Sequence, residues 1–65
     1  MNLKKLEQKA RFYNQIHGLP LKDACAKAIT DTMSAEEIGQ MAVEMDLTID
    51  DLIEHLQGII SGQNP

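Results

Sequence analysis

Apolar residues recur along the chain at intervals of three and four, the spacing that places side chains on one face of an α-helix. The first such stretch runs from about Leu3 to His17, and Asn2 is a suitable N-cap for it. Gly18 predicts the end of this helix, because glycine readily adopts the left-handed conformation of a C′ residue. The apolar stripe consists of Leu3, Leu6, Ala10, Tyr13 and Ile16 or His17.

A second helix is predicted from Pro20, which suits a first helical turn, to somewhere between Thr30 and Thr32. Its small residues would let a neighbouring helix approach closely. The chain has one cysteine, Cys25, which is expected to be a small buried hydrophobe, since it has no partner for a disulfide or a CxxC motif. The apolar face consists of Leu21, Ala24, Cys25, Ala28 and Ile29, with Ala26 nearby.

Two further helices carry clear start signals. Ser34 and Glu37 form one predicted capping box, and Thr48 and Asp51 stand at the same spacing for another. Gly39 costs its helix about 1 kcal/mol relative to alanine. Either it allows close contact with another helix or the cost is uncompensated. Each start also has a hydrophobic staple, a pair of apolar residues that flank the cap: Met33–Ile38 and Leu47–Leu52. The apolar positions of the third helix are Ile38, Met41, Ala42 and Met45. The fourth helix is expected to end near Ile60.

The predicted fold is all-α: a compact bundle of four short helices, the last two forming a helix-turn-helix-like hairpin around Asp46-Leu47-Thr48. Residues 1–62 are expected to form a single helical domain and residues 63–65 a frayed tail. A chain of 65 residues buries only about 60% of its unfolded surface, so its stability is marginal and oligomerisation is a common remedy. So short a chain has little room for both a core and a substrate cleft, and an enzyme is therefore not expected.

Charge is divided unequally along the sequence. Residues 1–27 hold all six bases and two acids, which gives +4, whereas residues 28–65 hold eight acids and no base, which gives −8. Such asymmetry bears on partners and on steering rather than on fold. The alternative is compensation within the molecule, with the basic first helix lying across the acidic one.

The window MAVEMDLTIDDLIEHL, from Met41 to Leu56, resembles the helix-turn-helix superfamily of DNA-binding domains. Ala42 stands where that motif has a small residue, and Asp46 stands where the turn usually has glycine. The resemblance covers under a third of the chain and implies a DNA-binding regulator. The string EEIGQMAVEMDL also resembles, more weakly, the first helix and loop of ubiquitin-associated domains, although that family has a further helix after the second.

The second helix of the helix-turn-helix window departs from a DNA reader in its chemistry. It carries Asp50, Asp51 and Glu54 without a cation, and phosphates would repel these carboxylates. Ile49 and Ile53 stand at positions that would face outward in that docking mode. They are therefore expected to belong to the core or to a protein interface, such as that of a homodimer.

Candidate sites of chemistry are few. A metal site needs several converging ligands, and Asp51 with His55 is the one pair at a suitable spacing on a helix face. His17 and His55 are therefore expected to be solvated rather than to bind a metal. No catalytic residue, metal or cofactor is predicted, and the protein is expected not to be an enzyme. With neither a signal peptide nor a long apolar run, it is expected to be cytoplasmic rather than membrane-bound.

The functional expectation is a small regulatory or interaction protein, of the size of bacterial and phage accessory factors. Its acidic face would bind a basic protein surface and could thereby inhibit a nucleic-acid-binding protein. The alternatives are a DNA-binding transcriptional regulator of helix-turn-helix type acting as a dimer, and a subunit or assembly factor without inhibitory role. The predicted partner-binding residues are Glu44, Asp46, Asp50, Asp51 and Glu54; a second contact patch is Lys4, Lys5, Lys9, Arg11 and Phe12; the candidate dimer residues are Ile49 and Ile53.

Overall fold

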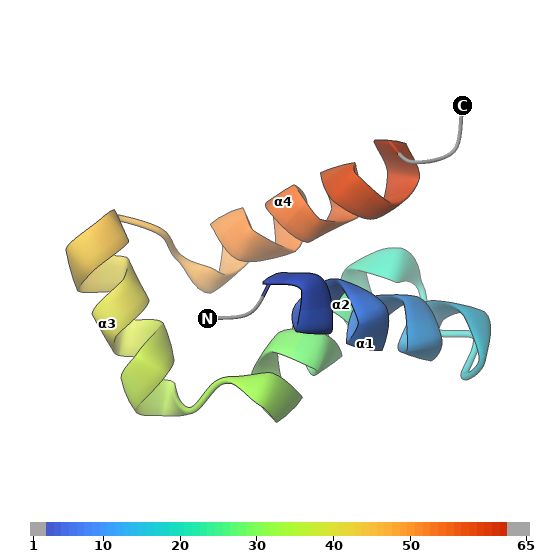
Figure 1. Ribbon diagram of the computed structural model, residues 1–65, viewed down its shortest axis with the longest axis horizontal. Helices are drawn as coiled ribbons and strands as arrows, with labels where there is room; N and C mark the ends of the chain where they lie inside the picture. The colour runs from blue at the N-terminus through green and yellow to red at the C-terminus, as the bar shows by residue number, and fades with distance from the viewer. Residues whose placement is uncertain (1–2, 63–65) are drawn as a thin grey trace.

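The computed structural model describes residues 3–62, which form four α-helices without a strand over that range (Figure 1). The helices are α1 (Leu3–Gln15), α2 (Leu21–Thr32), α3 (Ala35–Met45) and α4 (Ile49–Gly62). The predicted all-α fold of four short helices is thus confirmed, with helix ends within two residues of those expected. The predicted cap at Asn2 and the predicted tail at 63–65 lie outside the described residues.

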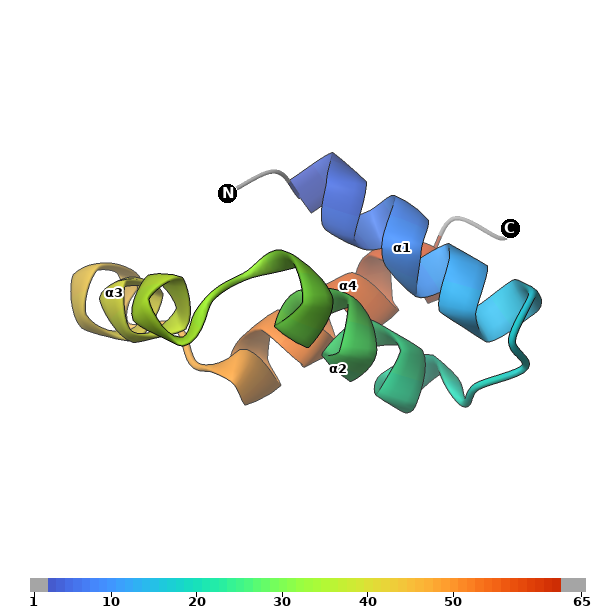
Figure 2. The same ribbon diagram turned by 90° about the horizontal axis from the view of Figure 1, so that it is seen from below.

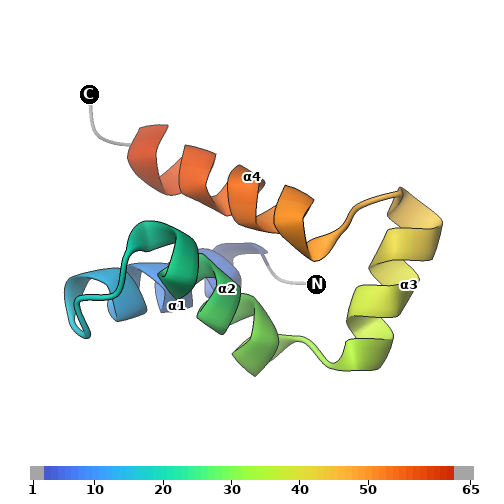
Figure 3. The same cartoon turned by 180° about the vertical axis from the view of Figure 1, so that it is seen from behind.

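Three of the helices form the body of the molecule. The chain turns back after α1 so that α1 and α2 pack against each other, and α4 packs on α2 and on α1 (Figure 2). α3 follows α2 and precedes α4, but it runs across one end of the molecule rather than alongside α4 (Figures 1 and 3). The turn expected between the last two helices is present, whereas the main packing of α4 is with the first two.

The core lies between α1, α2 and α4. Ala24 and Ala28 are fully buried, which agrees with the close helix approach that their small size predicted. Cys25 is buried as expected, and this burial raises the pKa of its thiol. The core cluster consists of Leu6, Ala10, Cys25, Ala28, Ile29, Met33, Met41, Leu52, Ile53, Leu56 and Ile60.

The predicted capping boxes of α3 and α4 are both formed. The backbone N–H of Glu37 donates to Ser34 Oγ at 3.1 Å, and the N–H of Ser34 donates to Glu37 Oε1 at 3.0 Å. The N–H of Asp51 likewise donates to Thr48 Oγ1 at 3.2 Å, while the N–H of Thr48 donates to Asp51 Oδ2 at 3.0 Å. Each pair satisfies two backbone donors that a helix start leaves open.

Two left-handed residues redirect the chain. Gly18, with φ of +71°, follows α1, and Asp46, with φ of 52° and ψ of 40°, caps the C-terminus of α3. Aspartate tolerates this region better than most non-glycine residues do. The predicted turn at Asp46 therefore forms without the glycine that such a turn usually has.

α3 is less embedded than its apolar spacing suggested. Met41 reaches the core and is 5% exposed, but Met45 on the same face is 61% exposed. The reason is that α3 crosses the end of the molecule, so its last turn extends beyond the other helices. The close contact expected at Gly39 is wrong, because nothing lies within 4 Å of where a Cβ would stand. The cost of this glycine is therefore uncompensated.

Candidate functional site

Exposed carboxylates follow one another along the chain where α3 passes into α4. We call Glu44, Asp46, Asp50, Asp51 and Glu54 the acidic corner. They come from the end of α3, the connecting turn and the first turns of α4, and all five residues are exposed. The left-handed conformation at Asp46 sets the direction in which the chain leaves α3. The structure thus exposes all five predicted partner-binding residues on consecutive segments of the chain, and the hollows of the surface distribute them: Glu44 lines one on α3, and Asp50 and Glu54 line another between α2 and α4.

The carboxylates of the acidic corner have little internal neutralisation. Asp51 accepts the capping bond from the Thr48 N–H, and this bond together with the Thr48 side chain lowers the pKa of Asp51. The other four have no hydrogen bond or ion pair with any side chain or backbone group within residues 3–62. The positive end of the α4 dipole favours Asp50 and Asp51 in its first turn. Ionised oxygens therefore remain available to an external cation.

One cation approaches the edge of the acidic corner. Lys22 of α2 lines a shallow hollow together with Asp50 and Glu54 of α4; Ile53 and Gln57 complete its lining. No ion pair joins Lys22 to either carboxylate in the described part of the chain. Compensation within the molecule is thus weak at this corner.

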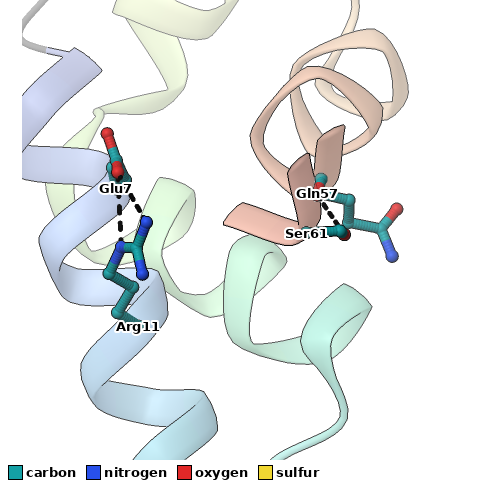
Figure 4. A network of polar contacts seen from close by, with 4 residues as sticks. All are labelled: Glu7, Arg11, Gln57 and Ser61. Atoms are coloured by element: carbon teal, nitrogen blue, oxygen red, sulfur yellow. Dashed lines mark hydrogen bonds and ion pairs between the residues drawn. The ribbon is translucent and has the colours of Figure 1, made fainter. Parts of the chain in front are cut away.

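Compensation is stronger on α1 and α2. Arg11 pairs with Glu7 at 3.0 Å along α1, as Figure 4 shows. Asp31 of α2 accepts a hydrogen bond from Tyr13, which lowers the pKa of its carboxyl, and Lys27 and Lys9 lower that pKa further. Part of the positive charge of α1 and α2 is therefore offset by acids on these same two helices rather than by the acidic corner.

The predicted second patch on α1 is mixed. Lys4 and Lys5 are exposed, but Lys9 is half-buried and the charge of Arg11 is offset by Glu7. Phe12, which was expected in this patch, is 49% exposed and therefore lies at the surface. Its ring lies edge-on to those of Tyr13 and His17, with centroids 5.9 and 5.1 Å away.

The two candidate dimer residues are occupied within the chain. Ile53 is 6% exposed and belongs to the core, while Ile49 is half-buried and packs against that core. Of the two expectations, core or interface, the core describes Ile53. A dimer that buried Ile53 would first have to open α4 from its neighbours.

Sequence reasoning overlooked four exposed apolar residues. Val43 is 86% exposed on α3, and Leu3, Ile16 and Met45 are also exposed. The position of Val43 off the apolar stripe of α3 could have identified it. The exposure of Met45 could not have been found in this way, since it depends on where α3 sits.

The described residues offer no metal centre: no group of three or more His, Cys, Asp or Glu in residues 3–62 could hold an ion. Ser61 donates to the backbone oxygen of Gln57 at 2.5 Å, so its hydroxyl is used within α4 (Figure 4). Across residues 3–62, each helix is too short or too polar to cross a membrane.

No protein-family model, curated protein or solved structure matches the chain.

Proposed function

We propose that this chain is a small regulatory or interaction protein that binds a basic surface of a macromolecular partner through the acidic corner. The observation that carries the proposal is the exposure of five carboxylates, four of which have no partner within residues 3–62. Ionic groups arranged in this way steer a partner of opposite charge and fix its orientation. Glu44 and Asp46 contact it from the α3 side, and Asp50, Asp51 and Glu54 contact it from the α4 side.

Such binding would inhibit a nucleic-acid-binding partner by competition. Phosphate oxygens are recognised mainly by lysine and arginine side chains, and carboxylate oxygens accept the same hydrogen bonds. A partner whose basic groove is covered by the acidic corner cannot bind nucleic acid at the same time. The inhibitor would then be displaced by salt, as the nucleic acid itself would be.

The alternative proposal is a dimeric DNA-binding regulator. Its weakness is the chemistry of α4, which buries Leu52, Ile53 and Leu56 and exposes acids on the opposite side. DNA contacts would have to come from α1 or from a surface that two copies form together. A gel-shift titration with duplex DNA separates the two functions, because a complex that weakens steeply with salt supports the regulator.

The experiment changes Asp50→Lys together with Glu54→Lys. Binding to a fluorescent oligolysine peptide is followed by anisotropy at low and moderate salt. Reversing two carboxylates should weaken binding by about tenfold or more, since each exposed pair contributes up to about 1 kcal/mol. Displacement of fluorescent duplex DNA from the same peptide tests the inhibitory step.

The matched control is Asp23→Lys with Glu36→Lys. These acids are exposed as well, each in the first turn of its helix, and the change in net charge is identical. The control should retain most of the affinity, and circular dichroism should show both variants as helical as the parent. Equal losses in the two variants would mean that net charge alone attracts the peptide, and the acidic corner would be rejected as the site.

A further inference from the structure

We infer that a hollow on α3, in which two methionines lie between carboxylates, seats an apolar side chain from a basic amphipathic helix of the partner. The inference rests on the proposed function, since the hollow adjoins the acidic corner and shares Glu44 with it. We call it the methionine hollow, and it is lined by Glu37, Gln40, Met41, Glu44 and Met45.

The methionine hollow follows one face of α3, because its lining residues recur at helical intervals of three and four. Met41 is nearly buried and forms its floor, while Met45 is largely exposed at one end. Methionine side chains are unbranched and polarizable, so they adapt to apolar groups of different shape. The exposed thioether of Met45 is therefore an apolar contact that the protein itself leaves uncovered.

The rim of the methionine hollow determines the charge of its occupant. Glu37 accepts the Ser34 N–H through Oε1, and this backbone bond, with the Ser34 side chain, lowers the pKa of Glu37. Glu37 is consequently ionised at neutral pH. Glu44 has no hydrogen bond within the described residues, and Asp46 follows closely. Covering these carboxylates with a neutral apolar surface would desolvate them without a counterion.

A basic amphipathic helix meets both requirements. Its apolar stripe supplies the side chain that contacts Met41 and Met45, and its flanking lysines or arginines reach Glu37, Glu44 and the acidic corner. Helices that insert an apolar face into a surface hollow are a common mode of peptide recognition. α3 is suited to this contact because it lies at the end of the molecule and exposes its last turn (Figure 3).

A second copy of the chain is the competing occupant. α1 carries cations together with the exposed Phe12, and the exposed Ile16 follows directly after the helix, so this segment has some of the required chemistry. Its cations are partly compensated by Glu7 and Asp31, which makes it the poorer match for the methionine hollow.

The test uses two synthetic peptides of leucine and lysine with identical composition. In one, the leucines form a single helical stripe; in the other, they are scattered. Anisotropy titrations of the unmodified protein should show the striped peptide binding about tenfold more tightly, since burial of one leucine side chain supplies at least that factor. In Met45→Gln the two peptides should bind with nearly equal affinity, so that the ratio of their dissociation constants is close to one.

Val43→Gln is the matched control, because Val43 is exposed on α3 but does not line the methionine hollow. It should keep the preference for the striped peptide. If Met45→Gln keeps it as well while Asp50→Lys with Glu54→Lys abolishes binding, the methionine hollow is rejected and the acidic corner stands. If neither peptide binds the unmodified protein at low salt, both proposals fail.

Light scattering of the protein alone identifies the competing occupant. A monomer at the concentrations used for the titrations supports a separate partner. Self-association that Met45→Gln abolishes would show that a second copy covers the methionine hollow, and it would overturn the assignment to a partner's helix.

Discussion

The hydroxyl of Tyr13 in α1 donates a hydrogen bond to the carboxylate of Asp31 in the last turn of α2. Lys27 places its ammonium 5.3 Å from the centre of the Tyr13 ring. The bond lowers the pKa of Asp31, with Lys27 and Lys9 acting in the same direction, and it raises the pKa of Tyr13. A polar contact at the surface thus joins the two helices whose apolar faces meet below it.

Tyr13→Phe should destabilise the protein slightly, and only within a window of pH. The depressed pKa of Asp31 contributes stability above about pH 4, the ordinary aspartate value, and that contribution is lost as pH falls through the folded-state pKa. The raised pKa of Tyr13 contributes stability below about pH 10, which is lost as pH rises further. Urea unfolding at a series of pH values should show the variant weaker between these limits and converging with the parent outside them.

An NMR titration provides the independent check of the Tyr13–Asp31 bond. The pKa of Asp31 should move upward in Tyr13→Phe, because the hydrogen bond is the main cause of its depression. A stability difference that is constant from acid to alkaline pH would assign the effect to ring packing and contradict this account.

Substitutions of the two capping residues, Ser34 and Thr48, should differ in their effect on global stability. Replacing either cap by alanine costs its helix about 1 kcal/mol. Thr48→Ala weakens α4, which carries the fully buried Leu56. Because α4 belongs to the core, this substitution should lower the urea midpoint of cooperative unfolding in proportion to the whole loss of about 1 kcal/mol. Ser34→Ala weakens α3, whose one buried residue is Met41. Because α3 contributes little to the core, this substitution should reduce the helicity but change the urea midpoint less than Thr48→Ala does. Far-ultraviolet circular dichroism during urea unfolding measures both quantities, and equal midpoint shifts would show that α3 unfolds together with the core.

Glycine-to-alanine substitutions should have opposite signs at different positions. Gly39 and Gly58 lie within helices, and no atom stands within 4 Å of an added Cβ at either place. Alanine there should stabilise the protein by up to about 1 kcal/mol. Gly18 has a positive φ, so Gly18→Ala should cost about 1–2 kcal/mol. Urea midpoints of the three variants check these signs; a loss at Gly39 would mean that the helix needs the glycine for a contact.

The local features of the fold could be predicted because the atoms that form them are close in sequence. The capping boxes of Ser34 and Thr48 connect residues three apart, and Gly18 and Asp46 adopt the left-handed conformation through their own chemistry. The Glu7–Arg11 pair spans one helical turn. In each case the spacing alone brings donor and acceptor together, whatever the rest of the chain does.

The arrangement of the helices was harder to predict. Periodicity identifies the apolar face of a helix but does not say which neighbour covers it, so the placement of Ile53 in the core and the exposure of Met45 required the structure. The Tyr13–Asp31 bond joins residues 18 apart and has no sequence signature. The acidic corner was recognisable because its carboxylates lie close in sequence, whereas the methionine hollow depends on the position of α3.

The position of α4 has a consequence for how the protein is made. Leu52, Leu56 and Ile60 close the core over residues contributed by the first two helices, among them Leu6 and Ile29. A nascent chain that has emerged only as far as α3 carries those apolar side chains without their cover. Folding must therefore wait until α4 has left the ribosome, and until then the exposed part of the polypeptide is open to chaperones and proteases.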